Sequence, residues 1–108
     1  MQEGRVIMKI IVSGKQLEMT EAIKNYAESK VSKITKYLEN ITETHITLTV
    51  ENTKTEGKVF KAIGTVQVPG KVIRVEEANS DLYGAIDLLA DGLERQTRKF
   101  KEKLKERE

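Results

Sequence analysis

The segment GTVQVPGKVIRVEEANSDLYGAIDLLADGL, residues 64–93, changes its hydrophobic period once and so decides the fold class. In its first half apolar residues alternate with polar ones, which is typical of strands with one buried face. The sequence VPGK at 68–71 predicts a type II turn between two such strands, because Pro fixes φ and Gly accepts a positive φ. From Ser80, with Asp81 behind it, the spacing becomes helical. The expected apolar face is Leu82, Ala85, Ile86, Leu89, Leu93, Phe100 and Leu104.

The chain before this segment predicts two more strands and another helix. Residues 6–12 are a β-branched run closed by Ser13 and Gly14, and residues 45–51 alternate apolar with polar side chains. Between these strands, Thr20 is the expected N-cap of a helix that ends near Asn40. Its apolar face is Ile23, Ala27, Val31, Ile34 and Leu38. After a polar turn at 52–57, the third strand is expected to continue to Val68, with a bulge at Gly64.

The resulting order, β-α-β-β-β-α, predicts an α+β fold. We expect a two-layer sandwich, in which one four-stranded sheet is covered on one face by two helices and is open to solvent on the other. The last five elements have the order of a double-stranded RNA-binding domain. With 108 residues the chain is the size of one domain, 1–108, in which residues 1–7 are expected to be a flexible N-terminal extension.

Composition excludes several classes of protein. The chain has no cysteine, so neither disulfides nor a zinc–thiolate site can hold the fold together. The first seven residues are too short and too polar for a signal peptide, and no apolar run approaches the roughly 20 residues that span a bilayer. We therefore expect a cytoplasmic protein with no membrane partner.

The sequence offers little for catalysis. Its single histidine, His45, lies on the expected outer face of a strand, and no pair of histidines has metal-ligand spacing. Asp81 lies well away from Asp87 and Asp91 at about 100° per helical residue, so the three do not cluster. We expect Asp87 and Asp91 to start an i,i+4 ladder, with ion pairs Asp91–Arg95 and Glu94–Arg98. The prediction is a non-enzyme without a catalytic residue, metal, cofactor or small-molecule substrate.

The net charge of +2 is not informative, but the charges are sorted along the chain. Residues 82–91 carry two acidic and no basic side chains, whereas residues 92–108 carry seven basic and four acidic ones. Lys30, Lys33 and Lys36 recur at three-residue steps on the first helix. On the second helix the basic residues Arg95, Lys99 and Lys103 recur along one flank. If the helices pack side by side, these stripes could form a groove wall for a phosphate backbone.

A structural explanation of the same charges is as good on the residues alone. Lysine and arginine near a helix C-terminus complement the helix dipole, and most charge runs are simply solvated. Tyr26 and Tyr37 lie near the basic stripe of the first helix, but tyrosines at such positions more often pack at the edge of the core than stack on bases.

Two motifs favour the nucleic-acid interpretation. VIRVEEANSDLYGAIDLLADGLERQTRKFKEK, residues 72–103, and MKIIVSGKQLEMTEAIKNYAESKVSKITKYLE, residues 8–39, resemble the signature of the ribosome hibernation-promoting factor and ribosome-associated inhibitor family. The resemblance implies a factor that binds the small ribosomal subunit and its rRNA in the channel of messenger and transfer RNA, and silences translation in stress or stationary phase. The RNA-binding positions it implies are Lys24, Lys30, Lys33, Lys36, Arg95, Arg98, Lys99 and Lys101, with Lys15 a weaker candidate.

The sequence departs from the family pattern at two places. Gly92 stands where members carry Lys or Arg, and Gly84 stands where they carry Ala. The family also has a long form with a C-terminal dimerisation domain, and the chain could be a short form or the N-terminal domain of a long one. As an isolated domain it is expected to be a monomer or a weak dimer.

Two rival functions remain open from the residues. One is a general double-stranded RNA-binding domain, which would recognise any A-form duplex across about 16 base pairs. The other is a protein-interaction module that uses the open sheet face or the edge strand at 6–12. The RNA hypothesis predicts that replacing Lys30, Lys33 and Lys36 with Glu abolishes ribosome binding and leaves the melting temperature nearly unchanged, because exposed charges add little stability.

Overall fold

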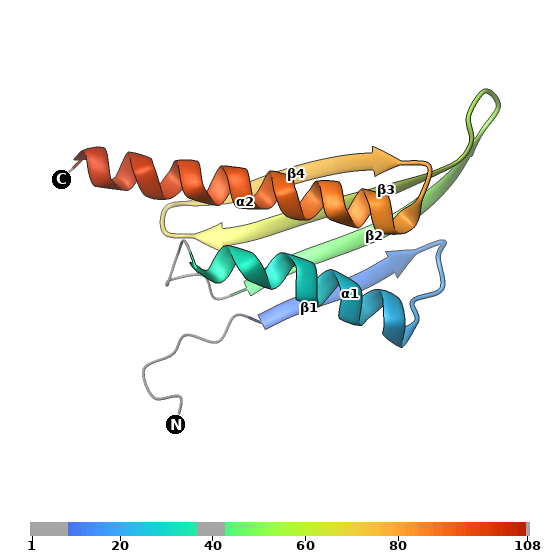
Figure 1. Ribbon diagram of the computed structural model, residues 1–108, viewed down its shortest axis with the longest axis horizontal. Coiled ribbons are helices and arrows are strands. Elements are labelled where there is room, and N and C mark those ends of the chain that lie inside the picture. The colour runs from blue at the N-terminus through green and yellow to red at the C-terminus, as the bar shows by residue number, and fades with distance from the viewer. Residues whose placement is uncertain (1–8, 37–42, 108) are drawn as a thin grey trace.

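The computed structural model describes residues 9–36 and 43–107, except the side chains of 35, 36 and 104–107. Its elements are β1 (Lys9–Lys15), α1 (Glu21–Val31), the 3-10 helix η1 (Ser32–Lys36), β2 (Glu43–Thr53), β3 (Gly57–Val68), β4 (Lys71–Asn79) and α2 (Leu82–Arg107). This order confirms the predicted α+β fold (Figure 1). The expected N-terminal extension, Tyr37, Leu38, Asn40 and the side chains of Lys36 and Leu104 lie outside the described residues.

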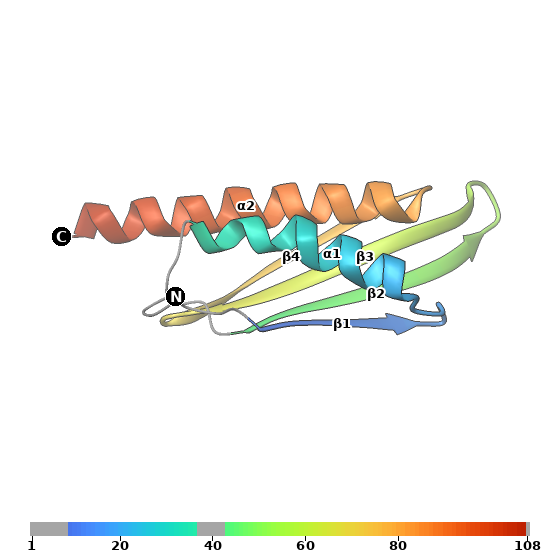
Figure 2. The same cartoon turned by 60° about the horizontal axis from the view of Figure 1, so that its bottom comes forward.

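The four strands form one mixed sheet in the order β1-β2-β3-β4. β1 is parallel to β2, and the other two pairs are antiparallel. A parallel pair needs a crossover connection, which contains α1 here. Both helices lie on the same face of the sheet, α1 toward β1 and β2 and α2 over β3 and β4 (Figures 1 and 2). In the described part of the chain the opposite face carries no helix, as the sequence predicts (Figure 2).

The core lies between the sheet and the two helices, and the predicted apolar faces point into it. Its fully buried residues are Ala27, Val31, Ile34, Ile46, Leu48, Ala62, Val66, Ala85, Ile86, Leu89, Ala90 and Leu93. Two fully buried residues are polar, Thr44 of β2 and Thr97 of α2, and the Thr97 hydroxyl donates a hydrogen bond to the Glu94 carbonyl. A hydroxyl satisfied within its own helix can be buried at little cost.

The helix N-termini follow the capping rules. Thr20 Oγ1 accepts a hydrogen bond from the Ile23 N–H at 3.2 Å, which confirms Thr20 as the cap of α1. At α2, Asp81 Oδ2 accepts from the Gly84 N–H at 2.8 Å, so Asp81 caps the helix rather than Ser80. The cap moves by one residue because the Asn79 side chain accepts from the Asp81 N–H and so fixes the approach to the helix.

Two element boundaries differ from the prediction. β1 does not end at Ser13 and Gly14 but continues to Lys15, and the chain turns at Gln16, which has a φ of 57°. Gly14 is needed for another reason: a Cβ there would lie 2.6 Å from the Leu17 carbonyl oxygen, because the following loop folds back over the strand. The regular α-helix α1 ends at Val31 and tightens into η1, with the Ser32 hydroxyl donating to the Ser29 carbonyl.

Gly64 does not form the predicted bulge. It pairs with Ile46 on one side and with Val75 on the other in an unbroken register. A Cβ at position 64 would lie 2.9 Å from Leu93 Cδ1 and 3.1 Å from Leu89 Cδ1. The glycine therefore serves the close packing of α2 on β3. In the neighbouring turn, Gly70 has the positive φ of 85° that a type II turn requires.

Candidate nucleic-acid interface

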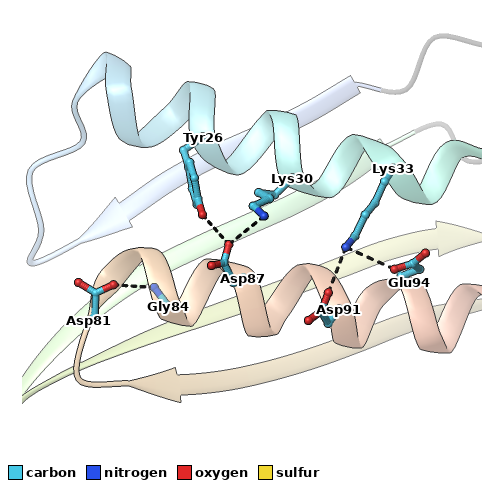
Figure 3. A network of polar contacts seen from close by, with 8 residues as sticks. All are labelled: Tyr26, Lys30, Lys33, Asp81, Gly84, Asp87, Asp91 and Glu94. Carbon is cyan, nitrogen blue, oxygen red and sulfur yellow. Dashed lines mark hydrogen bonds and ion pairs between the residues drawn. The ribbon is translucent and has the colours of Figure 1, made fainter.

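The predicted basic row of the first helix meets a row of acids on α2. Lys30 Nζ lies 3.4 Å from Asp87 Oδ1, and Lys33 Nζ, in η1, lies 3.0 Å from Asp91 Oδ1 (Figure 3). Lys33 also contacts Glu94 Oε1 at 3.3 Å. Asp91 thus pairs across to Lys33 instead of starting the expected ladder to Arg95. The spacing i, i+4, i+7 places Asp87, Asp91 and Glu94, here called the interhelical acids, on the flank of α2 that faces α1.

Tyr26 strengthens this junction. Its hydroxyl donates a hydrogen bond of 2.6 Å to Asp87 Oδ1, the same oxygen that Lys30 approaches. The Tyr26 ring packs edge-on against Tyr83 at a centroid distance of 4.8 Å, and Lys30 Nζ lies 5.7 Å from the Tyr26 centroid. Tyr26 is partly buried against the core, which confirms the prediction of core-edge packing for this tyrosine.

These contacts shift the protonation equilibria of the groups involved. The hydrogen bond from Tyr26, followed by the attraction of Lys30, holds the pKa of Asp87 below its ordinary value. The same hydrogen bond raises the pKa of Tyr26, and hydrogen bonding to Asp91 is the main cause of the raised pKa of Lys33. At neutral pH, Tyr26 therefore stays protonated, Lys33 stays charged and Asp87 stays ionised, which are the states that form the junction. Two lysines face three carboxylates here, so their positive charge is more than compensated.

The predicted cations of α2 lie on two different flanks. Arg98 and Lys101 follow Glu94 at four and seven residues and therefore share the flank of the interhelical acids. At about 100° per residue, Arg95 and Lys99 fall on the side of β4. Lys99, with Lys103, lines a hollow against that strand. The expected stripe of Arg95, Lys99 and Lys103 consequently does not lie beside the lysines of α1, because the interhelical acids occupy that flank.

The remaining predicted cations are scattered further. Lys24 is exposed on α1, on the flank away from Tyr26, and Lys15 is exposed at the end of β1. Lys36 belongs to η1, but its side chain is outside the described residues. The structure therefore brings Lys30 and Lys33 together with the interhelical acids. It leaves Lys24 and the predicted cations of α2 on several flanks of the helical layer, and Lys15 at the end of β1.

Sequence reasoning missed Lys71 and Phe100 as partners. Lys71 opens β4, yet its Nζ lies 5.9 Å from the centroid of the Phe100 ring on α2. Both residues line a hollow of about 150 Å³ between β4 and α2, with Ile73, Gln96, Lys99 and Lys103. The only sequence signal was a lysine next to a tight turn, and its proximity to α2 depends on how the helix crosses the sheet.

The family departures Gly84 and Gly92 lie at close contacts. A Cβ at Gly92 would lie 2.8 Å from Val75 Cγ1, and a Cβ at Gly84 would lie 2.9 Å from Asn79 Oδ1. Gly92 lets α2 approach β4 at Val75, and Gly84 lets α2 approach the last residue of β4, Asn79, more closely than a residue with a Cβ would allow. The missing basic side chain at position 92 is thus linked to the packing of the helix on the sheet.

His45 is exposed, as predicted for an outward strand histidine, and its Nε2 lies 2.9 Å from Glu43 Oε1. Among the described residues no three His, Cys, Asp or Glu side chains gather as a metal site would require. No described helix is long and apolar enough to cross a membrane.

Comparisons with known proteins identify the family. Residues 10–105 match the family described as "Sigma 54 modulation protein / S30EA ribosomal protein". A ribosome hibernation promoting factor of Azotobacter vinelandii is 39% identical over 101 residues, which cover 94% of this chain and 90% of the relative. A ribosome hibernation promotion factor of Deinococcus radiodurans is 41% identical over 90 residues, or 83% of this chain. The chain spans only 47% of that relative's length.

Solved structures agree with the sequence comparison. The N-terminal domain of Protein Y from Thermus thermophilus is 34% identical with a TM-score of 0.75, over 86% of this chain and 99% of that one. A ribosomal subunit interface protein from Coxiella burnetii is 26% identical with a TM-score of 0.77, over 87% and 98% of the two chains. The match over nearly the whole chain, in sequence and in fold, shows that this protein belongs to the Sigma 54 modulation protein / S30EA ribosomal protein family, which confirms the predicted resemblance.

Proposed function

We propose that this chain is a ribosome hibernation factor that binds the small ribosomal subunit and blocks translation. It would occupy the channel of messenger and transfer RNA in the cytoplasm and would act by steric occlusion, without catalysing a reaction. The observation that carries the proposal is the match to proteins named ribosome hibernation promoting factor. In one of these relatives the match covers 90% of the relative's length.

The helical face supplies the cations that such binding needs. Contacts to structured RNA are made mainly to phosphates and 2′-hydroxyls, so that no base sequence has to be read. Arg95, Arg98, Lys99 and Lys101 extend along the exposed sides of α2 and are proposed to contact phosphates. Lys24 and Lys36 are proposed to extend this surface along the first helix.

Lys30 and Lys33 require a different description. Each is already paired with a carboxylate of α2, so a phosphate would have to compete with that carboxylate or share the ammonium group with it. We propose that these two lysines contribute less to RNA affinity than the cations of α2. Their larger effect would be on the relative placement of the two helices.

Sedimentation with small ribosomal subunits tests the proposal. The protein should co-sediment in a sucrose gradient, and transfer RNA bound to the subunit should displace it. The logarithm of affinity should fall linearly with the logarithm of salt concentration, with a slope of about 0.7 to 0.9 per phosphate contacted. The protein should also inhibit translation in a cell-free system.

Two results would contradict the proposal. One is a subunit affinity that does not depend on salt. The other is equal competition by an A-form duplex of unrelated sequence, which would favour a general double-stranded RNA-binding domain. Capture of non-ribosomal proteins after nuclease treatment would instead point to a protein-interaction module.

A further inference from the structure

The hollow between β4 and the C-terminal half of α2, here called the β4 hollow, combines three lysines with one aromatic ring. It has a volume of about 150 Å³ and is lined by Lys71, Ile73, Gln96, Lys99, Phe100 and Lys103. At about 30 Å³ for each water, roughly five water molecules would fill it, so a phosphate group fits. Two segments that are distant in sequence build the hollow. Lys71 is the first residue of β4, and the other two lysines, Lys99 and Lys103, belong to α2.

The lining has no carboxylate. In the described part of the chain, no ion pair engages Lys71, Lys99 or Lys103, whereas Lys30 and Lys33 contact three carboxylates. Three lysines that line one concave surface bring like charges together, and an anion bound among them relieves the repulsion. The β4 hollow is therefore better suited to an anion than the junction between α1 and α2.

The other lining residues restrict how an anion would bind. Lys71 Nζ lies 5.9 Å from the Phe100 centroid, so the ring attracts the ammonium group and limits its motion. Gln96 is exposed at the rim, and its amide can donate to a phosphate oxygen or accept from a ribose hydroxyl. Ile73 is buried and closes the floor. The three lysines of the lining are exposed.

We propose that the β4 hollow is a phosphate-binding pocket for a backbone phosphate of RNA, held by Lys71, Lys99 and Lys103, with Gln96 positioned to contact the adjacent ribose. This inference rests on the proposed function, since it assigns a second contact region to the same RNA partner. It places that region on the β4 flank of α2, away from α1.

Single substitutions to glutamine test the pocket. Lys71→Gln and Lys103→Gln should each lower the salt slope of binding to small ribosomal subunits by about one unit, and the double variant by about two. The matched control is Lys58→Gln, an exposed lysine at the opposite hairpin of the sheet that changes the net charge equally. Lys71→Arg should retain the slope. Thermal melting of each variant checks that the fold is intact.

The outcomes separate this inference from the proposed function. If the unmodified protein fails to bind subunits, the proposed function is wrong. If it binds with a steep salt dependence, and the Lys71 and Lys103 variants keep the full slope, the pocket is wrong while the function stands. Inorganic phosphate provides another comparison, followed by the amide chemical shifts of Lys71 and Phe100. Shifts caused by phosphate, together with an unchanged slope, would indicate a site for a free anion and overturn the assignment to RNA.

Discussion

The phenolic hydroxyl of Tyr26 donates a 2.6 Å hydrogen bond to Asp87 Oδ1 and thereby joins α1 to α2 across 61 positions of sequence. Lys30 shares the same carboxylate, and Lys33 repeats the arrangement further along with Asp91 and Glu94 (Figure 3). The contact between the two helices is therefore polar on its exposed side and apolar beneath. Its protonation and its charges can be changed without altering the core.

Tyr26 should titrate above the ordinary tyrosine value of 10.0, because losing its proton removes the hydrogen bond to Asp87 and places a phenolate beside a carboxylate. When the pKa of a group is higher in the folded than in the unfolded protein, the group contributes its full stabilisation at pH values below the pKa of the unfolded state. The contribution of this contact is therefore lost as the pH rises from about 10 through the folded value. Ultraviolet titration of the phenolates should show a component with a raised pKa, and this component should be absent in Tyr26→Phe.

The Asp87→Asn variant should return the pKa of Tyr26 toward 10.0, whereas Asp91→Asn should leave it raised, since Asp91 is not among the groups that shift it. On the acid side the sign reverses. The pKa of Asp87 is lowered, so its contribution is present above the ordinary value of 3.8 and is lost as the pH falls through the folded value. A phenolate titration that shows no tyrosine above 10.0 would contradict the hydrogen bond.

Reversing the charge of Lys33 should destabilise the fold more than neutralising it. Lys33→Gln removes two partly exposed ion pairs, and such pairs contribute at most about 1 kcal/mol each. Lys33→Glu additionally places a third carboxylate beside Asp91 and Glu94. Thermal melting should therefore rank Lys33→Glu below Lys33→Gln, and Asp91→Lys should recover part of the loss in the Lys33→Glu background.

This expectation replaces the one drawn from the sequence, by which reversing Lys30, Lys33 and Lys36 leaves the melting temperature nearly unchanged. That expectation assumed isolated exposed lysines, whereas Lys30 and Lys33 have carboxylate partners on α2. Loss of ribosome binding in the triple variant could then result from a displaced helix. Glutamine variants distinguish the two effects more clearly, and equal melting temperatures for Lys33→Glu and Lys33→Gln would argue against the junction.

Leu93 and Gly64 should be energetically coupled. Leu93 is fully buried, and Leu93→Ala should cost about 2–5 kcal/mol of the free energy of unfolding. Gly64→Ala places a Cβ 2.9 Å from Leu93 Cδ1, and overpacking of this kind costs about 1–3 kcal/mol. Urea unfolding of both single variants and the double variant should show that Gly64→Ala costs less when Leu93 is alanine. Strict additivity would mean that the two positions do not share this contact.

Gly92→Lys introduces the basic residue that the sequence resemblance leads one to expect at this position, yet it should lower stability. Leaving glycine gains about 1 kcal/mol of helix propensity. The new Cβ would nevertheless lie 2.8 Å from Cγ1 of Val75, whose β-branched side chain has little freedom to move. Adding Val75→Ala should recover stability in part. The control is Leu88→Lys, which adds a cation one turn earlier on α2 at an exposed position and should leave the melting temperature nearly unchanged.

Most of the fold could be predicted from local patterns. The change of period near Ser80, the glycine at the 68–71 turn and the cap at Thr20 each depend on neighbours within a few residues, and these predictions held or moved by one residue. Gly64 and Gly14 were misinterpreted because a glycine in the sequence does not indicate which atoms pack against it in the fold. At Gly64 the reason is a helix about 30 positions away in sequence, and at Gly14 it is a carbonyl of the next loop.

The candidate site was less predictable. A helical wheel identifies which residues share a flank, but it does not tell which neighbour that flank will face. Asp87 and Asp91 looked like members of a ladder along α2 because their partners, Tyr26 in α1 and Lys33 in η1, are 61 and 58 positions distant in sequence. For the same reason Arg95 and Lys99 were grouped with the lysines of α1, although Lys99 lies against β4. The residue types were informative, and their pairing required tertiary structure.

The parallel pairing of β1 with β2 has a consequence for the order of assembly. Lys9 pairs with Glu43, so this contact encloses more than 30 residues, whereas Thr53 pairs with Gly57 across a tight hairpin. Closing a longer segment costs more chain entropy, and the antiparallel meander of β2, β3 and β4 can form before β1 joins it. β1 is also one of the two edge strands of the sheet, and among the described residues it pairs with β2 alone, whereas β3 pairs on both sides. Backbone amides of β1 should therefore exchange with deuterium sooner than those of β3, and partial opening of the molecule should begin by detachment of its first strand.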